Sequence, residues 1–337
     1  MRHALLVLVL AGAPALARAD ASINVMLNAQ GQQLASDYGQ SEDQVIQRVK
    51  DGIASYYETN NIAELLRGFA DTAAADDRGI GVDYDLHPGD VVVGAEAHGA
   101  LATDVTLDGS SHVVTGAVVG GTATAGWDLA KVGAPRVAVF ANGFYEGATI
   151  HGLTGHLLSL GGHALVRVVT ARGGGAVTWT GLAVMAGVEY ARWSLGTSAP
   201  IISDTALTSA STGEVKEIAF IANGTLSLLS STVSIPLEVT TGVKLFGVLV
   251  IYGGGGADLT FGSSTLTAGL SGDLTIDADR TPIGTATITA SGSVSPTAVT
   301  AHALAGLQLT TRHVHVFVQG EITPQAETAA LGVRGAF

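Results

Sequence analysis

The sequence contains no cysteine among its 337 residues, so a disulfide scaffold and a cysteine-ligated zinc or iron–sulfur site are excluded. A lipoprotein-type lipid anchor also needs a cysteine, so this kind of membrane attachment is excluded as well. Charged residues make up only 13% of the chain and hydrophobic residues 47%, a composition that argues against intrinsic disorder. Lys and Arg number 16 against 29 Asp and Glu, so the chain lacks the positive charge with which proteins bind nucleic acid.

Long hydrophobic runs are also missing beyond the first twenty residues, although the mean hydropathy is positive, at +0.39. The best candidate for a membrane helix, residues 243–259, is interrupted by Lys244, four consecutive glycines and Asp258. Strands that cross lipid resolve this conflict, because only alternate residues of such a strand must be apolar.

Residues 1–19 have the pattern of a secretory signal peptide. Arg2 and His3 precede an apolar core at residues 5–10, and Ala17-Arg18-Ala19 supplies a small-x-small cleavage site. An apolar core of about ten residues is too short to span a bilayer as a helix. We therefore expect cleavage after Ala19 and export of the mature chain through the inner membrane.

Apolar and polar residues alternate most clearly between Val233 and Leu245, and similar alternation recurs along the chain. A series of such strands joined by short turns predicts an all-β fold, a transmembrane antiparallel up-and-down β-barrel of about ten strands. Residues 198–231 and 263–297 are expected to be long external loops, although their Thr, Val and Ile content leaves twelve or fourteen strands possible. The ten expected strands are residues 89–107, 111–121, 135–146, 155–171, 176–197, 232–245, 247–262, 298–310, 312–322 and 328–337.

The last expected strand ends on an aromatic residue. Leu331, Val333 and Phe337 alternate outward, whereas Arg334 points inward. This end resembles the terminal strand of bacterial outer-membrane β-barrels, although Gly335 departs from the aromatic residue often found two positions before the end. The resemblance covers the architecture of about residues 80–337. It implies a place in the bacterial outer membrane, contact with its lipid, and insertion by the outer-membrane assembly machinery.

Residues 20–78 differ, because their apolar residues recur at helical spacing. Ser41 to Gln44 has the signature of a capping box, and Val45 and Val49 follow on one face of the expected helix. Asn60-Asn61 is expected to separate two helices. We predict that this helical segment plugs or caps a barrel formed by residues 79–337; packing on the periplasmic leaflet and recruitment of a partner are alternatives.

Charged side chains on the polar faces of the strands are expected to point into the barrel. In a functional interpretation they line a permeation path or a ligand cavity and set its charge preference. In a structural interpretation they form ion pairs and hydrogen bonds that fill a narrow interior, which a small barrel favours. The expected lumen-facing residues are Glu96, Arg136, Glu146, Arg167, Glu189, Glu238, Lys244, Asp258, Glu321 and Arg334.

The sequence offers no clear enzyme, metal or cofactor signal, and we expect none of the three. His313 and His315 lie two apart on one strand with His302 on the neighbouring strand, yet no Asp-rich or Cys-rich motif accompanies them. No G-x-S-x-G motif marks a nucleophile, and the glycines at 253–256 lack the Lys-Ser/Thr of a phosphate loop.

The leading functional expectation is a passive channel or conduit for small or hydrophobic solutes. The alternative is a surface-exposed structural or adhesive barrel that acts through its long external loops. A soluble β-solenoid is a third possibility, but it predicts internal repeats of about 20–30 residues, which the sequence does not show. The sequence identifies neither a solute nor a surface partner.

Overall fold

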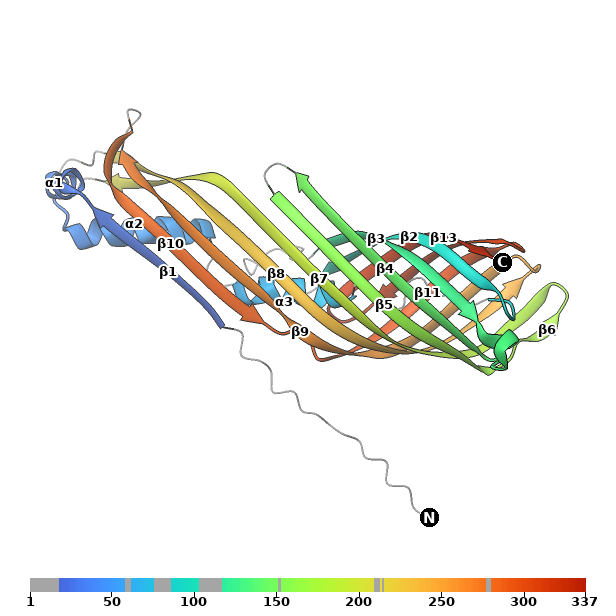
Figure 1. The fold of residues 1–337 in the computed structure, drawn as a ribbon. Coiled ribbons are helices and arrows are strands. Elements are labelled where there is room, and N and C mark those ends of the chain that lie inside the picture. The colour runs from blue at the N-terminus through green and yellow to red at the C-terminus, as the bar shows by residue number, and fades with distance from the viewer. Residues whose placement is uncertain are drawn as a thin grey trace, which may run out of the picture.

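The computed structural model describes residues 18–57, 62–75, 86–102, 117–150, 153–208, 213, 215–276 and 280–337. Within these ranges the chain forms one antiparallel sheet of thirteen strands, together with three α-helices and the short 3-10 helix η2, Leu129–Val132 (Figure 1). The core of the expected signal peptide and the expected helix break at Asn60-Asn61 lie outside the described residues.

Ten of the strands close into a ring. Each pairs antiparallel with its neighbours, and pairing of β13 with β2 closes the barrel. The ring runs in the order β2 (Val91–Ala102), β3 (Ala117–Asp128), β4 (Val137–Ile150), β5 (Leu153–Val169), β7 (Val177–Thr208), β8 (Val215–Leu245), β9 (Leu249–Ile276), β11 (Val299–Thr310), β12 (Val314–Ile322) and β13 (Ala326–Ala336). The number of strands is the ten expected from the sequence, so the antiparallel barrel is confirmed and the solenoid alternative is wrong. The bounds differ: β3 covers Ala117–Asp128 where 111–121 was expected, and β7, β8 and β9 are longer than expected. The short strand β6 (Arg172–Gly174) pairs with β7 at one end.

The two segments expected to be long loops are strands instead. Residues 198–208 continue β7, residues 215–231 begin β8, residues 263–276 end β9, and β10 covers Thr281–Val294. Their Thr, Ile and Val residues suit a pleated sheet, and each segment pairs in register with its neighbour. The expectation of loops was wrong because a strand whose outward residues are polar has the same composition as a polar loop.

These strand continuations, together with β10 and β1 (Arg18–Leu27), form a sheet that projects from one side of the barrel rim; we call it the extension. β1 pairs with β10 from Arg18, opposite Ser293, to Leu27, opposite Gly284. β8 contributes 31 residues to barrel and extension together, a length of about 100 Å at the usual rise per strand residue. Figure 1 shows these strands continuing well past the ends of β3, β4 and β5.

The outer face of the sheet changes character where the extension begins. In the barrel, Leu237 and Leu259 are exposed on this face, and the apolar series reaches as far as the partners Val233 and Phe261. From Val233 to Val243 the ten residue steps of β8 cover about 26 Å of bilayer at a tilt of about 40°, which matches the apolar band of membrane barrels. Beyond that point most outward residues are polar: Asn223, Thr225, Ser227, Ser263, Thr267, Ser271, Thr285, Thr287 and Thr289. The apolar exceptions are Val215, Ile221 and Leu229 of β8 and Met26 of β1. The barrel therefore has a lipid-facing wall, whereas the extension has a hydrophilic outer face.

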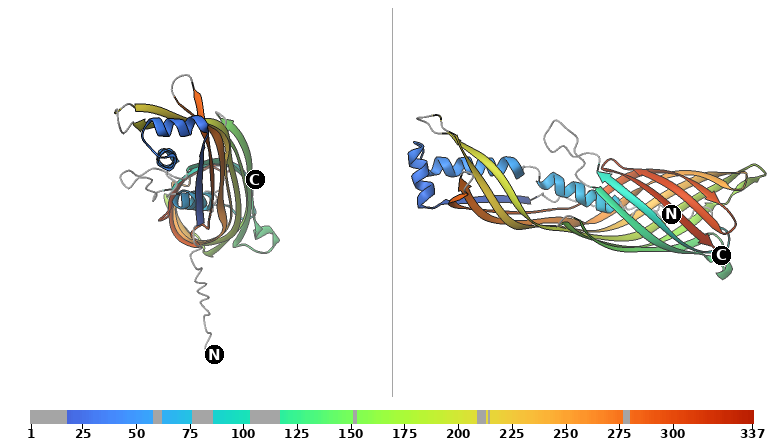
Figure 2. Two further views of the ribbon diagram at one scale, coloured as in Figure 1. Left: turned by 90° about the vertical axis from the view of Figure 1, so that its left-hand side faces the viewer. Right: turned by 90° about the horizontal axis from the view of Figure 1, so that it is seen from above.

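Helices α1 (Ala29–Asp37) and α2 (Glu42–Tyr57) pack on the concave side of the extension (Figure 2). The predicted capping box at the start of α2 is confirmed, because the Gln44 backbone N–H donates to Ser41 Oγ at 3.2 Å and the Ser41 N–H donates to Gln44 Oε1 at 2.8 Å. The apolar face of α2 is buried with strand residues in one core, whose members include Val45, Val49, Ile218, Phe220, Leu274 and Ile288. This core belongs to the extension and is separate from the barrel interior.

Helix α3 (Ile62–Ala75) lies where the extension meets the barrel and contacts strands from opposite sides of the ring, including β2, β8 and β13. Leu66 is fully buried against Leu228 and Leu266. The Asp71 carboxylate accepts a hydrogen bond from the Thr297 N–H at 2.6 Å, which fixes the helix to the connection between β10 and β11. This helix therefore lies across the mouth of the barrel on the extension side.

The sequence predicted that the segment 20–78 is helical, but part of it is a strand. Residues from Asp20 to Leu27 belong to strand β1, and the additional helix α1 begins after Asn28, whose side chain caps it by accepting from the N–H groups of Gln30 and Gly31. The short alternation Ile23–Val25–Leu27 gave too weak a strand signal, although its inward residues pack into the extension core.

Candidate functional site: the barrel interior and its mouth

Six of the expected lumen-facing charges are buried inside the ring. Their strands place them on the inward face, opposite the exposed apolar residues, as the period-2 geometry requires. Polar and aromatic side chains fill the space between them; for example, Tyr252 Oη donates to Gln319 Oε1 at 3.0 Å. The six charged residues are Glu96, Glu189, Glu238, Asp258, Glu321 and Arg334.

The other four expected residues lie elsewhere. Arg136 is exposed in the turn before β4, so the expectation that it faces the lumen was wrong; the strand alternation begins only at Val137. Arg167 is half-buried at the end of the ring, where it donates to Asp128 Oδ2 at 2.6 Å. Lys244 lines the mouth described below. Glu146 lies in β4, but its side chain is outside the described part of the structure.

The largest group of interior charges surrounds His302. Its Nδ1 is 2.7 Å from Asp258 Oδ2, and its Nε2 is 3.5 Å from Glu238 Oε1. Glu321 completes the group, since its carboxylate lies within 4.8 Å of the ligand atoms of Glu238 and His302. We call these four residues the His302 cluster. Glu238 lies in β8, Asp258 in β9, His302 in β11 and Glu321 in β12.

Two further histidine–carboxylate pairs lie in the interior. His163 of β5 is hydrogen-bonded to Glu189 of β7, and Asn142 donates to the other Glu189 oxygen at 3.3 Å. In β2, His98 Nδ1 lies 4.0 Å from Glu96 Oε1. Paired polar groups of this kind offset part of the cost of burying charge inside a barrel.

Glycines on neighbouring strands make room for these imidazole rings. A Cβ added at Gly256 would lie 2.8 Å from His302 Nε2, and one added at Gly187 would lie 2.9 Å from His163 Cε1. The sequence does not predict these contacts, because each glycine is distant in sequence from the histidine it faces. A buried histidine opposite an inward glycine is visible only once the register is known.

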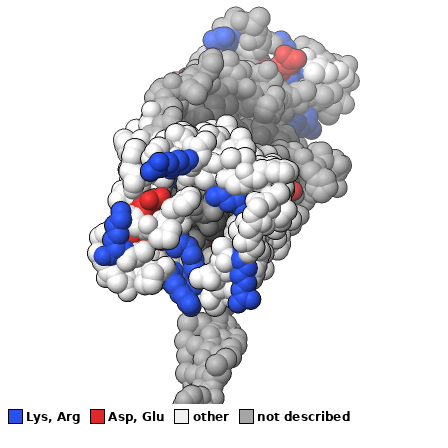
Figure 3. Space-filling view, turned by 90° about the vertical axis from the view of Figure 1, so that its right-hand side faces the viewer, with Lys and Arg blue, Asp and Glu red and all other residues white. Residues whose placement is uncertain are grey.

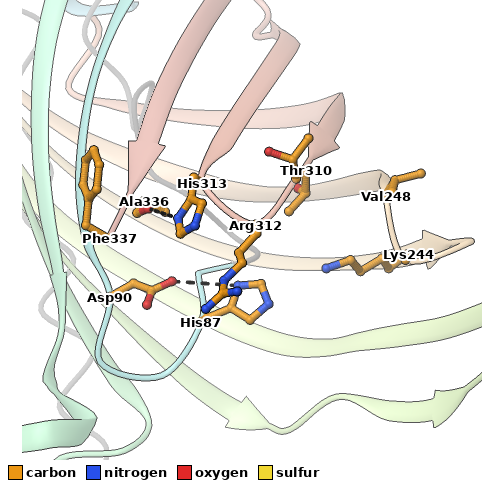
Figure 4. A pocket seen from close by; sticks show the side chains of 11 residues that line it. His87, Asp90, Lys244, Val248, Thr310, Arg312, His313, Ala336 and Phe337 are labelled. Atoms are coloured by element: carbon orange, nitrogen blue, oxygen red, sulfur yellow. Dashed lines mark hydrogen bonds and ion pairs between the residues drawn. The ribbon is translucent and has the colours of Figure 1, made fainter.

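The end of the barrel that carries the C-terminus contains an open pocket of about 480 Å³ (Figure 4). Lys244, Arg312 and His87 are directed into it, with Asp90 Oδ2 3.9 Å from His87 Nδ1. Figure 3 shows Lys and Arg side chains spread around this end. The exposed basic residues here are Lys131, Arg136, Arg172 and Arg312. The mouth is therefore positively charged, although the chain as a whole is acidic.

The histidines first considered as a metal pair do not meet. His313 lies in the turn at this mouth, where its Nδ1 is 3.2 Å from the carbonyl oxygen of Ala336, whereas His315 is buried in β12. His302 pairs in β11 with Gly256, far along the strand from Thr310, the partner of His315. The turn around residues 311–313 breaks the alternation on which the pairing depended.

The expected assembly signal lies on β13. Leu331 and Val333 are exposed on the outer face of the barrel wall. Phe337 follows the strand, and its backbone bonds with Val91 of β2 in both directions, so the last residue takes part in closing the ring. Its side chain is 74% exposed.

Among the described residues, no helix is long and apolar enough to cross a bilayer. Solved structures with a similar arrangement include the outer-membrane protease OmpT of Escherichia coli, with 10% identity and a TM-score of 0.36 over 74% of this chain and 96% of that one. The translocator domain of the autotransporter NalP of Neisseria meningitidis matches with 11% identity and a TM-score of 0.29, over 85% and 98%. The toluene transporter TbuX of Ralstonia pickettii matches with 10% identity and a TM-score of 0.27, over 81% and 99%.

No curated protein sequence matches the chain. The closed ring and its apolar outer wall are those of an outer-membrane β-barrel. The Lsa36-like family model covers residues 5–337, nearly the whole sequence. The chain is thus an outer-membrane β-barrel protein and belongs to the Lsa36-like family.

Proposed function

We propose that this protein is a closed barrel that anchors the extension at the bacterial surface, where the extension and its helices act as a structural or adhesive platform. The observation that carries this proposal is the change from apolar to polar outward residues at Val233 and Phe261. A hydrophilic outer face is stable in water and unfavourable in lipid, so the extension belongs outside the bilayer.

The direction of the extension follows from the connections at the two ends of the barrel. Outer-membrane barrels keep short turns on the periplasmic side. The end with the C-terminus has the three-residue turns 246–248 and 311–313. The opposite end carries the extension, α1 and α2, and fourteen residues connect β2 with β3 there. The contrast is not complete, because the three-residue turn 323–325 lies at the extension end and the eight-residue connection 129–136 lies at the end with the C-terminus. These features support an extension that faces the outside of the cell.

Epitope tags at the two ends of β8 test this orientation. Gly213 precedes the strand at the tip of the extension and Gly247 follows it at the opposite end; both have φ +72° and open space around the Cβ position. We expect antibody to label intact cells that carry the tag at Gly213. Cells with the tag at Gly247 should be labelled only after permeabilisation. The reverse pattern would place the extension in the periplasm and contradict the proposal.

The barrel itself is proposed to be closed to ions. Inward residues such as Glu238, Asp258 and Glu321 are at most 1% exposed, whereas side chains that line a water-filled pore are wetted. Helix α3 also covers one mouth. We therefore expect the purified protein to give no discrete conductance steps in planar bilayers. Steps that change when Glu238 is replaced by lysine would instead establish the passive channel as the function.

A further inference from the structure

The His302 cluster has a geometry that ion pairing alone does not require. Gly256 of β9 is the register partner of Glu238 on one side and of His302 on the other. Because Gly256 has no side chain, the imidazole of His302 extends from β11 across β9. It approaches the Glu238 carboxylate on β8, the strand on the other side of β9. Glu321 approaches the same point from β12. Three strands of the ring thus direct nitrogen and oxygen donors to one buried position.

Asp258 orients the imidazole. His302 Nδ1 and Asp258 Oδ2 are joined by a hydrogen bond of 2.7 Å, which fixes the ring so that Nε2 is directed toward Glu238. Metal-binding histidines are commonly held by a carboxylate in this way. His302 Nε2 is fully buried, and its contact with Glu238 Oε1 at 3.5 Å is too long for a well-formed hydrogen bond.

Charge and distance both suit a divalent cation. His302 can contribute at most one positive charge to three buried carboxylates, whereas a divalent ion contributes two. Two ligand atoms bound to zinc at about 2.1 Å in tetrahedral geometry lie roughly 3.4 Å apart. The observed separation of His302 Nε2 and Glu238 Oε1 is 3.5 Å.

We propose that Glu238, His302 and Glu321 bind one divalent transition-metal ion, preferentially Zn²⁺, inside the barrel. Imidazole and carboxylate donors together favour zinc over calcium or magnesium, and a water molecule supplies a fourth ligand. Asp258 is a positioning residue that holds His302. The ion is structural: it joins β8, β11 and β12 across β9. No metal was expected from the sequence, because the carboxylates that meet His302 are distant from it along the chain.

Metal analysis of the refolded protein tests the site. The full chain is refolded from urea into detergent with Zn²⁺, free metal is removed on a desalting column, and folded barrels are identified by heat-modifiable migration on a gel. We expect one zinc per folded barrel and a higher urea midpoint than for protein refolded with a chelator. Less than about 0.1 zinc per folded barrel would overturn the proposal and leave the cluster as an ion-pair network.

Matched variants separate this site from other buried histidine–carboxylate groups. Glu321→Gln is isosteric and removes one ligand charge, so zinc should be lost from the folded fraction; Glu238→Gln is the second variant if the first does not fold. Glu189→Gln alters the His163 pair and should retain one zinc. Asp258→Asn should weaken zinc binding by about 10–100-fold without abolishing it. Equal zinc content in Glu321→Gln, Glu238→Gln and wild type would contradict the assignment.

Cobalt provides an independent readout. Co²⁺ in a tetrahedral site of nitrogen and oxygen donors absorbs visible light much more strongly than octahedral aqueous Co²⁺ does. We expect this band in protein refolded with Co²⁺ and its loss in Glu321→Gln. A wild-type spectrum like that of aqueous cobalt would exclude the tetrahedral site.

Discussion

Replacing Leu237 with arginine is expected to destabilise the folded protein in lipid vesicles by about 2–4 kcal/mol. Leu237 is 54% exposed near the middle of the outward apolar series of β8. In a bilayer this exposure is to acyl chains, and a guanidinium placed there loses its hydration without gaining a partner. Urea unfolding in vesicles, followed by tryptophan fluorescence, measures the loss.

Ser227→Arg is the matched control. Ser227 is exposed on the same face of the same strand, ten residues earlier, but it belongs to the extension. Because water solvates the extension, this change should alter the free energy of unfolding by less than about 0.5 kcal/mol. Equal destabilisation by both arginines would mean that lipid covers the extension as well, and the boundary at Val233 and Phe261 would be wrong.

Alanine at Gly256 is expected to destabilise the barrel by about 1–3 kcal/mol, the usual cost of overpacking a closely packed interior. The added methyl group would collide with the carbonyl oxygen of Leu237, a backbone atom, and would lie 2.8 Å from His302 Nε2. Since the backbone of β8 cannot move without disturbing its ladder, the strain is not relieved by a side-chain rotation. The urea midpoint and the folded fraction on a gel both report it.

Gly269→Ala provides the comparison within the same strand. Gly269 has no atom within 4 Å of an added Cβ, so alanine there should be neutral or slightly stabilising. A Gly256→Ala variant as stable as Gly269→Ala would show that His302 does not need the space above Gly256. That result would also weaken the packing argument for the other histidines that face glycines.

The barrel could be predicted because alternation along a single strand determines which residues face lipid. Leu237 and Glu238 were assigned to opposite faces from their positions alone, and the structure places one outside and the other inside. The extension was missed for the complementary reason. Its outward residues, such as Thr225 and Thr287, face water, and without lipid on that side the pattern no longer distinguishes a strand from a polar loop.

Contacts within the interior were beyond sequence reasoning, because they depend on register. Glu238 and His302 are 64 positions apart, and only the shared pairing with Gly256 brings them together. Helix α2 shows the opposite case. Its capping box joins Ser41 and Gln44, three residues apart, so a local pattern was enough to predict the hydrogen bonds that the structure contains.

The continuity of β7, β8 and β9 has a mechanical consequence. No linker separates the part of each strand in the membrane from the part beyond it, so a pull on the extension is transmitted along covalent backbone directly into the wall of the cylinder. The ladder bonds between these strands lie across the direction of such a load and resist it together in shear, where a flexible tether would yield one bond at a time. A load applied to the extension therefore meets the combined resistance of three continuous strands.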